Sequence, residues 1–349
     1  MTPRLTILDG VPLAPLTTLG IGGAARHYAR IGTPAQLARA LAWAQDKGVE
    51  TLVLGGGSNL LIGDEGFPGL VLHVVIDGVE LVESGETTEV TAGAGVPWDD
   101  LVAKVVEHRL SGVECLSGIP GCVGATPIQN VGAYGQEVAE TIVRVDVVDR
   151  AKAEPHILTN TECEFGYRDS RFKRSDRDRF IVTAVTFRLV NGGVPTIRYP
   201  ELQRYLESEG LTSPNLRDVR QAVLAIRRRK SMVVDAADPD AHSAGSFFTN
   251  PIVPADVADR IEVEGMPRYV ETGGVKLSAA WLIERAGFSR GHVAGNVGLS
   301  TKHCLAIVNR GGGTAREVVA LANEIRRRVL ERFGVTLVPE PVFVNVSES

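Results

Sequence analysis

The sequence predicts an α+β or mixed α/β fold, because segments of strand composition occur both next to one another and in alternation with helical segments. Two helical segments carry clear start and stop signals, and the strand-like segments are rich in β-branched residues. The helical segments span 33–48 and 314–333, and the strand-like segments span 49–55, 70–76, 88–94, 142–148, 180–189 and 335–344.

The first predicted helix covers residues 33–48. Thr33 is a suitable N-cap, and Gln36 can complete a capping box with it. Gly48 ends the helix, because glycine readily adopts the left-handed conformation found after a last turn. A strand over 49–55 follows at once, so this part of the chain is a helix–strand unit that ends in a tight loop.

Two glycine-rich loops are candidates for holding a large cofactor. The first is GGGSN (55–59), and the second is the weakly charged segment 116–135. Glycines leave backbone N–H groups free to surround a pyrophosphate, whereas three glycines alone favour a simple turn. Two such loops in one body favour the cofactor. The nearest G-x-G-x-x-G match starts at Gly20 without a clear strand before it, and no P-loop pattern occurs.

The remaining elements are predicted from caps and composition. A short helix begins near Pro97, and another runs from residue 216 into the basic run RRRK (227–230). The helix over 314–333 has Thr314 and Glu317 as a capping box, and a strand closes the chain.

Composition excludes several classes of protein. The 349 residues suggest roughly two or three domains, and 44% hydrophobic with 23% charged residues is typical of a globular protein. A net charge of −5 argues against nucleic-acid binding. Four scattered cysteines fit neither a metal site nor a disulfide framework. No signal peptide and no membrane-spanning segment is recognisable, so we expect a cytoplasmic protein without membrane insertion.

Seven segments of the chain form an ordered set. They are TTLGIGGAARHYA (17–29), LGGGSNLL (54–61), GIPGCVGATPIQNVGAYG (118–135), CEFGYRDSRFK (163–173), AGSFFTNP (244–251), KLSAAWLIERAGF (276–288) and LVPEP (337–341). Together they resemble the family of UDP-N-acetylenolpyruvoylglucosamine reductases, also called UDP-N-acetylmuramate dehydrogenases. The order matches the family across almost the whole chain.

This resemblance implies a vanillyl-alcohol-oxidase-type (PCMH-type) FAD-binding domain of two subdomains, together with a substrate-binding α+β domain. We accordingly expect FAD-binding subdomains at 1–75 and 76–214, and a substrate-binding domain at 215–334. The C-terminal strand, within 335–349, is expected to pack back against the second subdomain.

The resemblance also implies a reaction. NADPH reduces a non-covalently bound FAD, and the flavin delivers hydride to the enolpyruvyl double bond of UDP-N-acetylglucosamine enolpyruvate, which gives UDP-N-acetylmuramate for peptidoglycan synthesis. The partners are therefore small molecules, and we expect a monomer.

Three residues match the catalytic positions of the family. Arg168 would stabilise negative charge on the substrate carboxylate, Ser246 would donate the proton, and Glu340 would assist at the double bond. Without the resemblance, they read as one cation in a solvated run, a turn residue and an edge-strand carboxylate. Where some members have E-V-R, this chain has Pro341 and Val342 after the glutamate, so no role for that arginine carries over.

Further positions match cofactor and substrate contacts of the family. The substrate set is Tyr199, on a loop that covers the substrate in one branch of the family, with Lys230, Asn250, Arg290 and His303. For the RRRK run, a helix C-terminus that favours cations is an equally good explanation. The cofactor set is Gly55, Gly56, Gly57, Ser58, Asn59, Pro120, Gly121, Gly124, Ala125, Thr126, Ile128, Gly132 and Gly135.

Two other functions compete with the reductase. A flavin oxidase of the same fold would commonly tether its flavin through a histidine in the glycine loop, and this loop has Asn59 with no histidine nearby. A catalytically inactive sugar-nucleotide sensor would keep the pocket, but the joint presence of Arg168, Ser246 and Glu340 disfavours it.

Overall fold

The structure is a computed structural model that describes residues 4–261, 265–271 and 273–346. The chain forms two units, each assembled from separate stretches of sequence. The first unit comprises Met1–Val11, Ala25–Gly56 and Pro68–Val233, and the second comprises Pro12–Ala24, Gly57–Phe67 and Val234–Ser349. Their interleaving differs from the three consecutive domains expected from the sequence.

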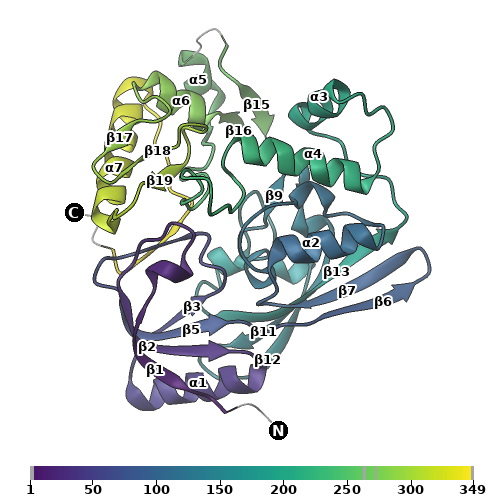
Figure 1. The fold of residues 1–349 in the computed structure, drawn as a ribbon, viewed down its shortest axis with the longest axis vertical. Helices are drawn as coiled ribbons and strands as arrows, with labels where there is room; N and C mark the ends of the chain where they lie inside the picture. The colour runs from purple at the N-terminus through teal and green to yellow at the C-terminus, as the bar shows by residue number, and fades with distance from the viewer. Residues whose placement is uncertain (1–3, 262–264, 272, 347–349) are drawn as a thin grey trace. The chain divides into compact units, whose positions relative to one another are not determined.

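A four-stranded sheet and one helix occupy one end of the first unit (Figure 1). The strand order is β1-β2-β5-β3, and β3 pairs in parallel with β5. Thr33 caps the helix by accepting a hydrogen bond from the Gln36 amide, and Gly48 ends it with φ 62°, as expected. These elements are β1 (Ile7–Pro12), β2 (Ala24–Ile31), β3 (Thr51–Leu54), β5 (Phe67–Val74) and α1 (Pro34–Lys47).

An antiparallel sheet forms the larger part of the first unit. Its order is β12-β11-β13-β7-β6, and the short strand β8 also pairs with β13. Its residues Val145, Val185 and Val90 belong to the same core as Leu37 of α1, so both sheets are built on one continuous core. The strands are β6 (Val79–Ser84), β7 (Thr87–Gly93), β8 (Leu110–Ser111), β11 (Ile142–Asp149), β12 (Pro155–Thr159) and β13 (Phe180–Asn191).

Three helices and a hairpin complete the first unit. Helix α4 has a capping box of Asn215 and Asp218, and its apolar face packs with Leu202 of α3 and with Cys115. This packing places α4 in the first unit, whereas the sequence boundary assigned it to the substrate domain. The elements are α2 (Trp98–Glu107), α3 (Pro200–Ser208), α4 (Leu216–Arg229), β9 (Gly132–Ala133) and β10 (Gln136–Glu137).

The second unit has its own core beneath the long helix α7. The predicted capping box of Thr314 and Glu317 is confirmed, and Gly334 ends the helix with φ 67°. Two three-stranded sheets, ordered β14-β16-β15 and β17-β18-β19, accompany it. The elements are β14 (Ile252–Val253), α5 (Ala255–Arg260), β15 (Arg268–Glu271), β16 (Gly274–Leu277), α6 (Ala279–Arg285), β17 (Val293–Ala294), β18 (Val297–Leu299), β19 (Ile307–Asn309) and α7 (Ala315–Phe333).

The last strand of the chain joins the second unit. Strand β20 (Val342–Val344) pairs in parallel with β4 (Leu60–Ile62), whereas the sequence placed this strand against residues 76–214. It is also shorter than predicted, since Pro339 and Pro341 lack the N–H groups that a sheet ladder requires.

In the described part of the chain, six short 3-10 turns connect these elements. They are Ala14–Leu16, Glu114–Leu116, Val123–Ala125, Val138–Glu140, Thr161–Cys163 and Arg171–Lys173. No described helix is both long enough and apolar enough to cross a bilayer.

Candidate active site

The two glycine loops meet in the first unit. The Gly56 amide donates a hydrogen bond to the Cys122 thiol, which lies in the second loop. A Cβ atom added to Gly56 would lie 2.8 Å from the Cα of Gly121, which is closer than real Cβ atoms come to other atoms. A Cβ atom on Gly55 would meet nothing nearer than 3.9 Å. Only a glycine at position 56 therefore allows this approach.

The second loop is fixed by its backbone to the end of the large sheet. The Trp98 amide donates to the Gly121 carbonyl at 2.9 Å, and the Gly124 amide donates to the Ala94 carbonyl at 2.9 Å. A Cβ atom on Gly124 would lie 2.6 Å from the Cβ of Ala94. Within the loop, the buried hydroxyl of Thr126 donates to the Val123 carbonyl. These contacts fix the second loop where it meets the first, and we call this meeting of the two loops the cradle.

The cradle fits the FAD expected from the sequence, because Gly56 and Gly121 meet with no side chain between the two backbones. Ala125 lies in the 3-10 turn Val123–Ala125 of the second loop, and the side chain of Ile128 is exposed to solvent. Gly132 and Gly135 lie further along, at the β9–β10 hairpin, and Pro120 precedes the close approach.

The end of the first glycine loop belongs to the second unit. Gly57 has φ 60°, and its carbonyl accepts a hydrogen bond from the Thr18 amide. Ser58 follows, and the Asn59 side-chain amide donates to the Glu340 carbonyl at 3.3 Å. The Asn59 carbonyl accepts from the Val342 amide at 2.9 Å. The loop is thus tied by its backbone to the segment that carries Glu340.

Ser246 and Glu340 lie on two extended segments that are hydrogen-bonded to each other in the second unit. The Glu340 amide donates to the carbonyl of Phe247, the residue after Ser246, at 2.9 Å. The buried rings of Phe247 and Phe248 anchor this stretch in the core. Both candidate catalytic side chains are half-buried, with part of each exposed to solvent. The prediction from AGSFF and VPEP that these residues act together is thus compatible with the local geometry.

Arg168 sits at the tip of a tight turn in the first unit. Gly166 and Asp169 exchange two backbone hydrogen bonds around it. Arg168 has φ 51°, in the left-handed region that is unfavourable for residues other than glycine. The turn is tied to the second glycine loop, because the Ser170 hydroxyl donates to the Ile128 carbonyl at 2.5 Å. The backbone is therefore held in a costly conformation, and the charge of Arg168 is close enough to act on Arg227 of α4.

The structure brings a second arginine to this region that the sequence did not single out. Arg227 of α4 donates to the Tyr134 hydroxyl and to the Met232 carbonyl, while its buried Nε has no hydrogen-bond partner among the described residues. Burial lowers the pKa of Arg227, and the nearby charge of Arg168 lowers it further. Burial also raises the pKa of Tyr134 to about 12. In the RRRK run, nothing in the sequence distinguishes the buried arginine from its exposed neighbours.

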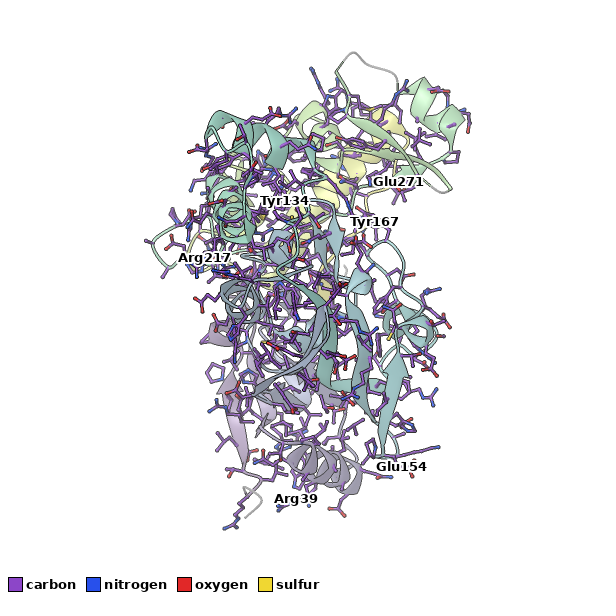
Figure 2. All side chains as sticks on the ribbon, turned by 90° about the vertical axis from the view of Figure 1, so that its right-hand side faces the viewer. Arg39, Tyr134, Glu154, Tyr167, Arg217 and Glu271 are labelled. Carbon is purple, nitrogen blue, oxygen red and sulfur yellow. The ribbon has the colours of Figure 1, made fainter. Side chains whose placement is uncertain are left out.

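Tyr134 and Tyr199 form an aromatic pair close to these cations. Their rings meet edge to face, with centroids 5.6 Å apart. Tyr134 is at the tip of the β9–β10 hairpin, and Tyr199 is the N-cap of α3. Tyr134 and Tyr167, which precedes Arg168, lie at the same end of the first unit, whereas Arg39 and Glu154 lie at the other end (Figure 2).

The other predicted substrate residues make structural contacts. Lys230 pairs with Glu201 of α3 at 2.7 Å. In the second unit, the Asn250 side chain accepts from the Ala279 amide at the start of α6, and Arg290 pairs with Glu284 on the surface. His303 lies in a turn in which its backbone amide donates to the Ser300 hydroxyl. None of these contacts by itself assigns a role in substrate binding.

An open groove of about 990 Å³ lies elsewhere in the first unit. Its lining includes Gly78, Glu80, Thr91, His156 and Thr183. Neither glycine loop lines it, so we do not place the active site there. Within the part of the chain that the structure describes, no group of His, Cys, Asp or Glu side chains could hold a metal ion.

Comparisons with known proteins agree with this geometry. The family model of an FAD binding domain matches residues 25–158, and that of the UDP-N-acetylenolpyruvoylglucosamine reductase C-terminal domain matches 238–344. The UDP-N-acetylenolpyruvoylglucosamine reductase of Thermobifida fusca (strain YX) is 50% identical over 97% of this chain and 98% of its own length. That of Salinispora arenicola (strain CNS-205) is 49% identical over 95% and 94%, respectively.

A solved structure supports the same assignment. The reductase of this name from Thermus caldophilus has a TM-score of 0.67 and 27% identity, covering 98% of this chain and 99% of its own. The predicted α+β fold with an FAD-binding domain is confirmed, and FAD is the cofactor of this oxidoreductase. The chain belongs to the UDP-N-acetylenolpyruvoylglucosamine reductase family.

Proposed function

We propose that this protein uses NADPH to reduce the enolpyruvyl group of UDP-N-acetylglucosamine enolpyruvate, giving UDP-N-acetylmuramate for peptidoglycan synthesis. The observation that carries the proposal is the hydrogen-bonded pairing of the segments of Ser246 and Glu340, found in a chain 50% identical to a reductase of that name. FAD, when bound between the glycine loops, supplies the hydride.

Arg168 is the proposed partner of the substrate carboxylate. Hydride addition to the far alkene carbon leaves negative charge on the carboxylate side of the substrate, and a fixed cation there lowers the barrier. A guanidinium binds a carboxylate through two parallel hydrogen bonds, so lysine would be a poor replacement. Arg227 adds a second positive charge in the same region.

Ser246 is the proposed proton donor, and Glu340 is proposed to assist at the same double bond. A serine hydroxyl is a weak acid, so it can protonate only a strongly basic carbon that is held within hydrogen-bond reach. The buried Phe247 and Phe248 beside Ser246, and the buried Leu337 before Glu340, support such fixed geometry. The reaction requires these two side chains and Arg168 to reach the same substrate.

The substrate nucleotide would contact the positions carried over from the family. We propose Lys230, Arg290, His303 and Asn250 as partners of the diphosphate or sugar, and Tyr199 as the residue that covers the substrate. We further propose that the protein works in the cytoplasm as a monomer on small molecules alone.

A half-reaction experiment tests this proposal. Purified protein is reduced anaerobically with NADPH until the yellow colour is lost, and the enolpyruvyl sugar is then added. We expect the colour to return quickly with wild type. Ser246→Ala should leave reduction by NADPH nearly intact and slow reoxidation by more than about 10²- to 10³-fold, the usual effect of a lost oxyanion donor. Reoxidation of Ser246→Ala at the wild-type rate would refute the role of the serine, and no reoxidation of wild type would refute the proposed substrate.

A further inference from the structure

Glu114 is a fully buried carboxylate that the mechanism above does not use. It begins the 3-10 turn Glu114–Leu116, and its side chain is 0% exposed. Its Oε2 accepts a hydrogen bond from the Gly112 amide at 2.8 Å. Its Oε1 accepts one from the Gln136 side-chain amide at 2.9 Å and another from the Thr196 amide at 2.7 Å. Among the described residues it makes no ion pair, so these donors alone support the carboxylate.

The contacts of Glu114 join three stretches of the first unit that are distant in sequence. Gln136 belongs to β10 of the hairpin, and Thr196 lies in the segment that leads to α3. The next residue, Cys115, repeats both connections: its amide donates to the Gln136 side-chain oxygen at 2.8 Å, and its thiol donates to the Thr196 carbonyl at 3.0 Å. Burial and the adjacent Glu114 charge both raise the pKa of the Cys115 thiol, which therefore remains a donor.

Each connected stretch carries one ring of the aromatic pair. Tyr134 is two residues before Gln136, and Tyr199 is three residues after Thr196. The two stretches are also in contact at their tips, because a Cβ atom on Gly135 would lie 3.0 Å from the Cβ of Arg198. Glu114 and Cys115 thus connect the two stretches whose rings meet edge to face.

We propose that Glu114 is a positioning residue that holds the hairpin and the 196–199 segment at the spacing where Tyr134 and Tyr199 form one binding surface. The role of that surface in holding the sugar nucleotide rests on the function proposed above. The positioning itself does not, because it concerns contacts present without substrate.

Two substitutions at position 114 separate positioning from simple burial of a side chain. Glu114→Gln keeps an oxygen for Gln136 and Thr196 and loses only the acceptor for Gly112. Glu114→Leu has a similar size but leaves the three donors from Gly112, Gln136 and Thr196 without their acceptor. Glu140→Gln is the matched control, since Glu140 also links this region to the 196–199 segment, through an exposed pair with Arg198.

The first measurement is amide hydrogen exchange of the FAD-loaded protein without substrate. We expect Glu114→Leu to raise exchange about tenfold in peptides containing residues 132–137 and 194–199, with the remaining peptides unchanged. Glu114→Gln and Glu140→Gln should exchange like wild type. Unchanged exchange in Glu114→Leu would overturn the proposal, and so would equal increases in Glu114→Leu and Glu140→Gln. If Glu114→Leu does not fold, Gln136→Leu, which removes the hairpin connection alone, decides by the same criterion.

The second measurement is steady-state kinetics. We expect Glu114→Leu to raise KM for the enolpyruvyl sugar about tenfold, with little change in kcat and no change in anaerobic reduction by NADPH, and Glu114→Gln to restore KM. Raised exchange with an unchanged KM would overturn the contribution of the tyrosine surface to binding. Failure of wild type to use the sugar would refute the proposed function alone, because the exchange result still judges the positioning.

Discussion

Replacing Gly56 by alanine should weaken FAD binding, because the two glycine loops leave no room for a methyl group there. The added Cβ would lie 2.8 Å from the Cα of Gly121, about 0.6 Å inside the 3.4 Å at which ordinary contact begins. The second loop cannot retreat, since its backbone is bonded to Trp98 and Ala94. The first loop must therefore move, and it is part of the proposed pyrophosphate cradle.

Overpacking of this kind costs about 1–3 kcal/mol. If the strain falls on the bound state, the Kd for FAD rises by roughly 5- to 140-fold. Any strain that remains in the apoprotein appears as a lower Tm, so both quantities are measured. Gly55→Ala is the matched control, because its methyl group would have 3.9 Å of clearance. Both Gly→Ala substitutions lower the conformational entropy of the unfolded chain equally, so this entropy effect cancels when the two variants are compared.

The assay is a titration of apoprotein with FAD, followed by quenching of flavin fluorescence, together with thermal unfolding of each apoprotein. We expect Gly55→Ala to resemble wild type and Gly56→Ala to bind FAD more weakly. If the two variants agreed within a factor of two in Kd and also had the same Tm, the close approach of the loops would not be what demands glycine at position 56.

Two further predictions concern charges around the site. Burial raises the pKa of Asp99, but hydrogen bonds from Arg220 and Gly118 and the charges of Arg220 and Arg227 outweigh it, so the pKa lies below the ordinary 3.8. The ionised Asp99 therefore stabilises the fold above pH 3.8, and this stabilisation is lost as the pH falls further. We expect Asp99→Asn to have a lower Tm than wild type at pH 7 and the two Tm values to converge below about pH 4. A Tm difference that stays constant with pH would contradict this. Glu201→Gln should free Lys230 from its ion pair and lower KM for the sugar nucleotide by about two- to fivefold, whereas an unchanged KM would argue against Lys230 as a diphosphate partner.

Local signals predicted the helices well. The caps at Thr33 and Thr314 are where the sequence placed them, because capping depends on residues within one turn of the helix. The strands β7, β11 and β13 were also anticipated from their β-branched composition, to within about two residues at each end.

The partners of those elements could not be predicted in the same way. Nothing local in Val342–Val344 indicates that this strand pairs with Leu60–Ile62, and the assignment of α4 to the first unit depends on its packing against α3 and Cys115. Because the two units are interleaved in sequence, no single boundary along the chain can separate them. These features depend on contacts between residues far apart in the chain, which periodicity and composition do not record.

The site shows the same division. The composition of the sequence marked the glycine loops, whereas Arg168 was marked only by the family resemblance. It did not mark Arg227 or Glu114, since an arginine in a basic run and a glutamate before a cysteine are unremarkable until burial is known.

The pairing of β4 with β20 has a consequence for how the protein is made. Residue 60 leaves the ribosome about 280 residues before its partner at position 342. At roughly 5–20 residues per second, that interval lasts about 15–60 seconds. During this time Asn59 lacks its hydrogen bonds with Glu340 and Val342, so the stretch after the glycines is not yet paired with the final strand. Tight retention of flavin by a nascent chain should therefore begin only once the final strand has emerged.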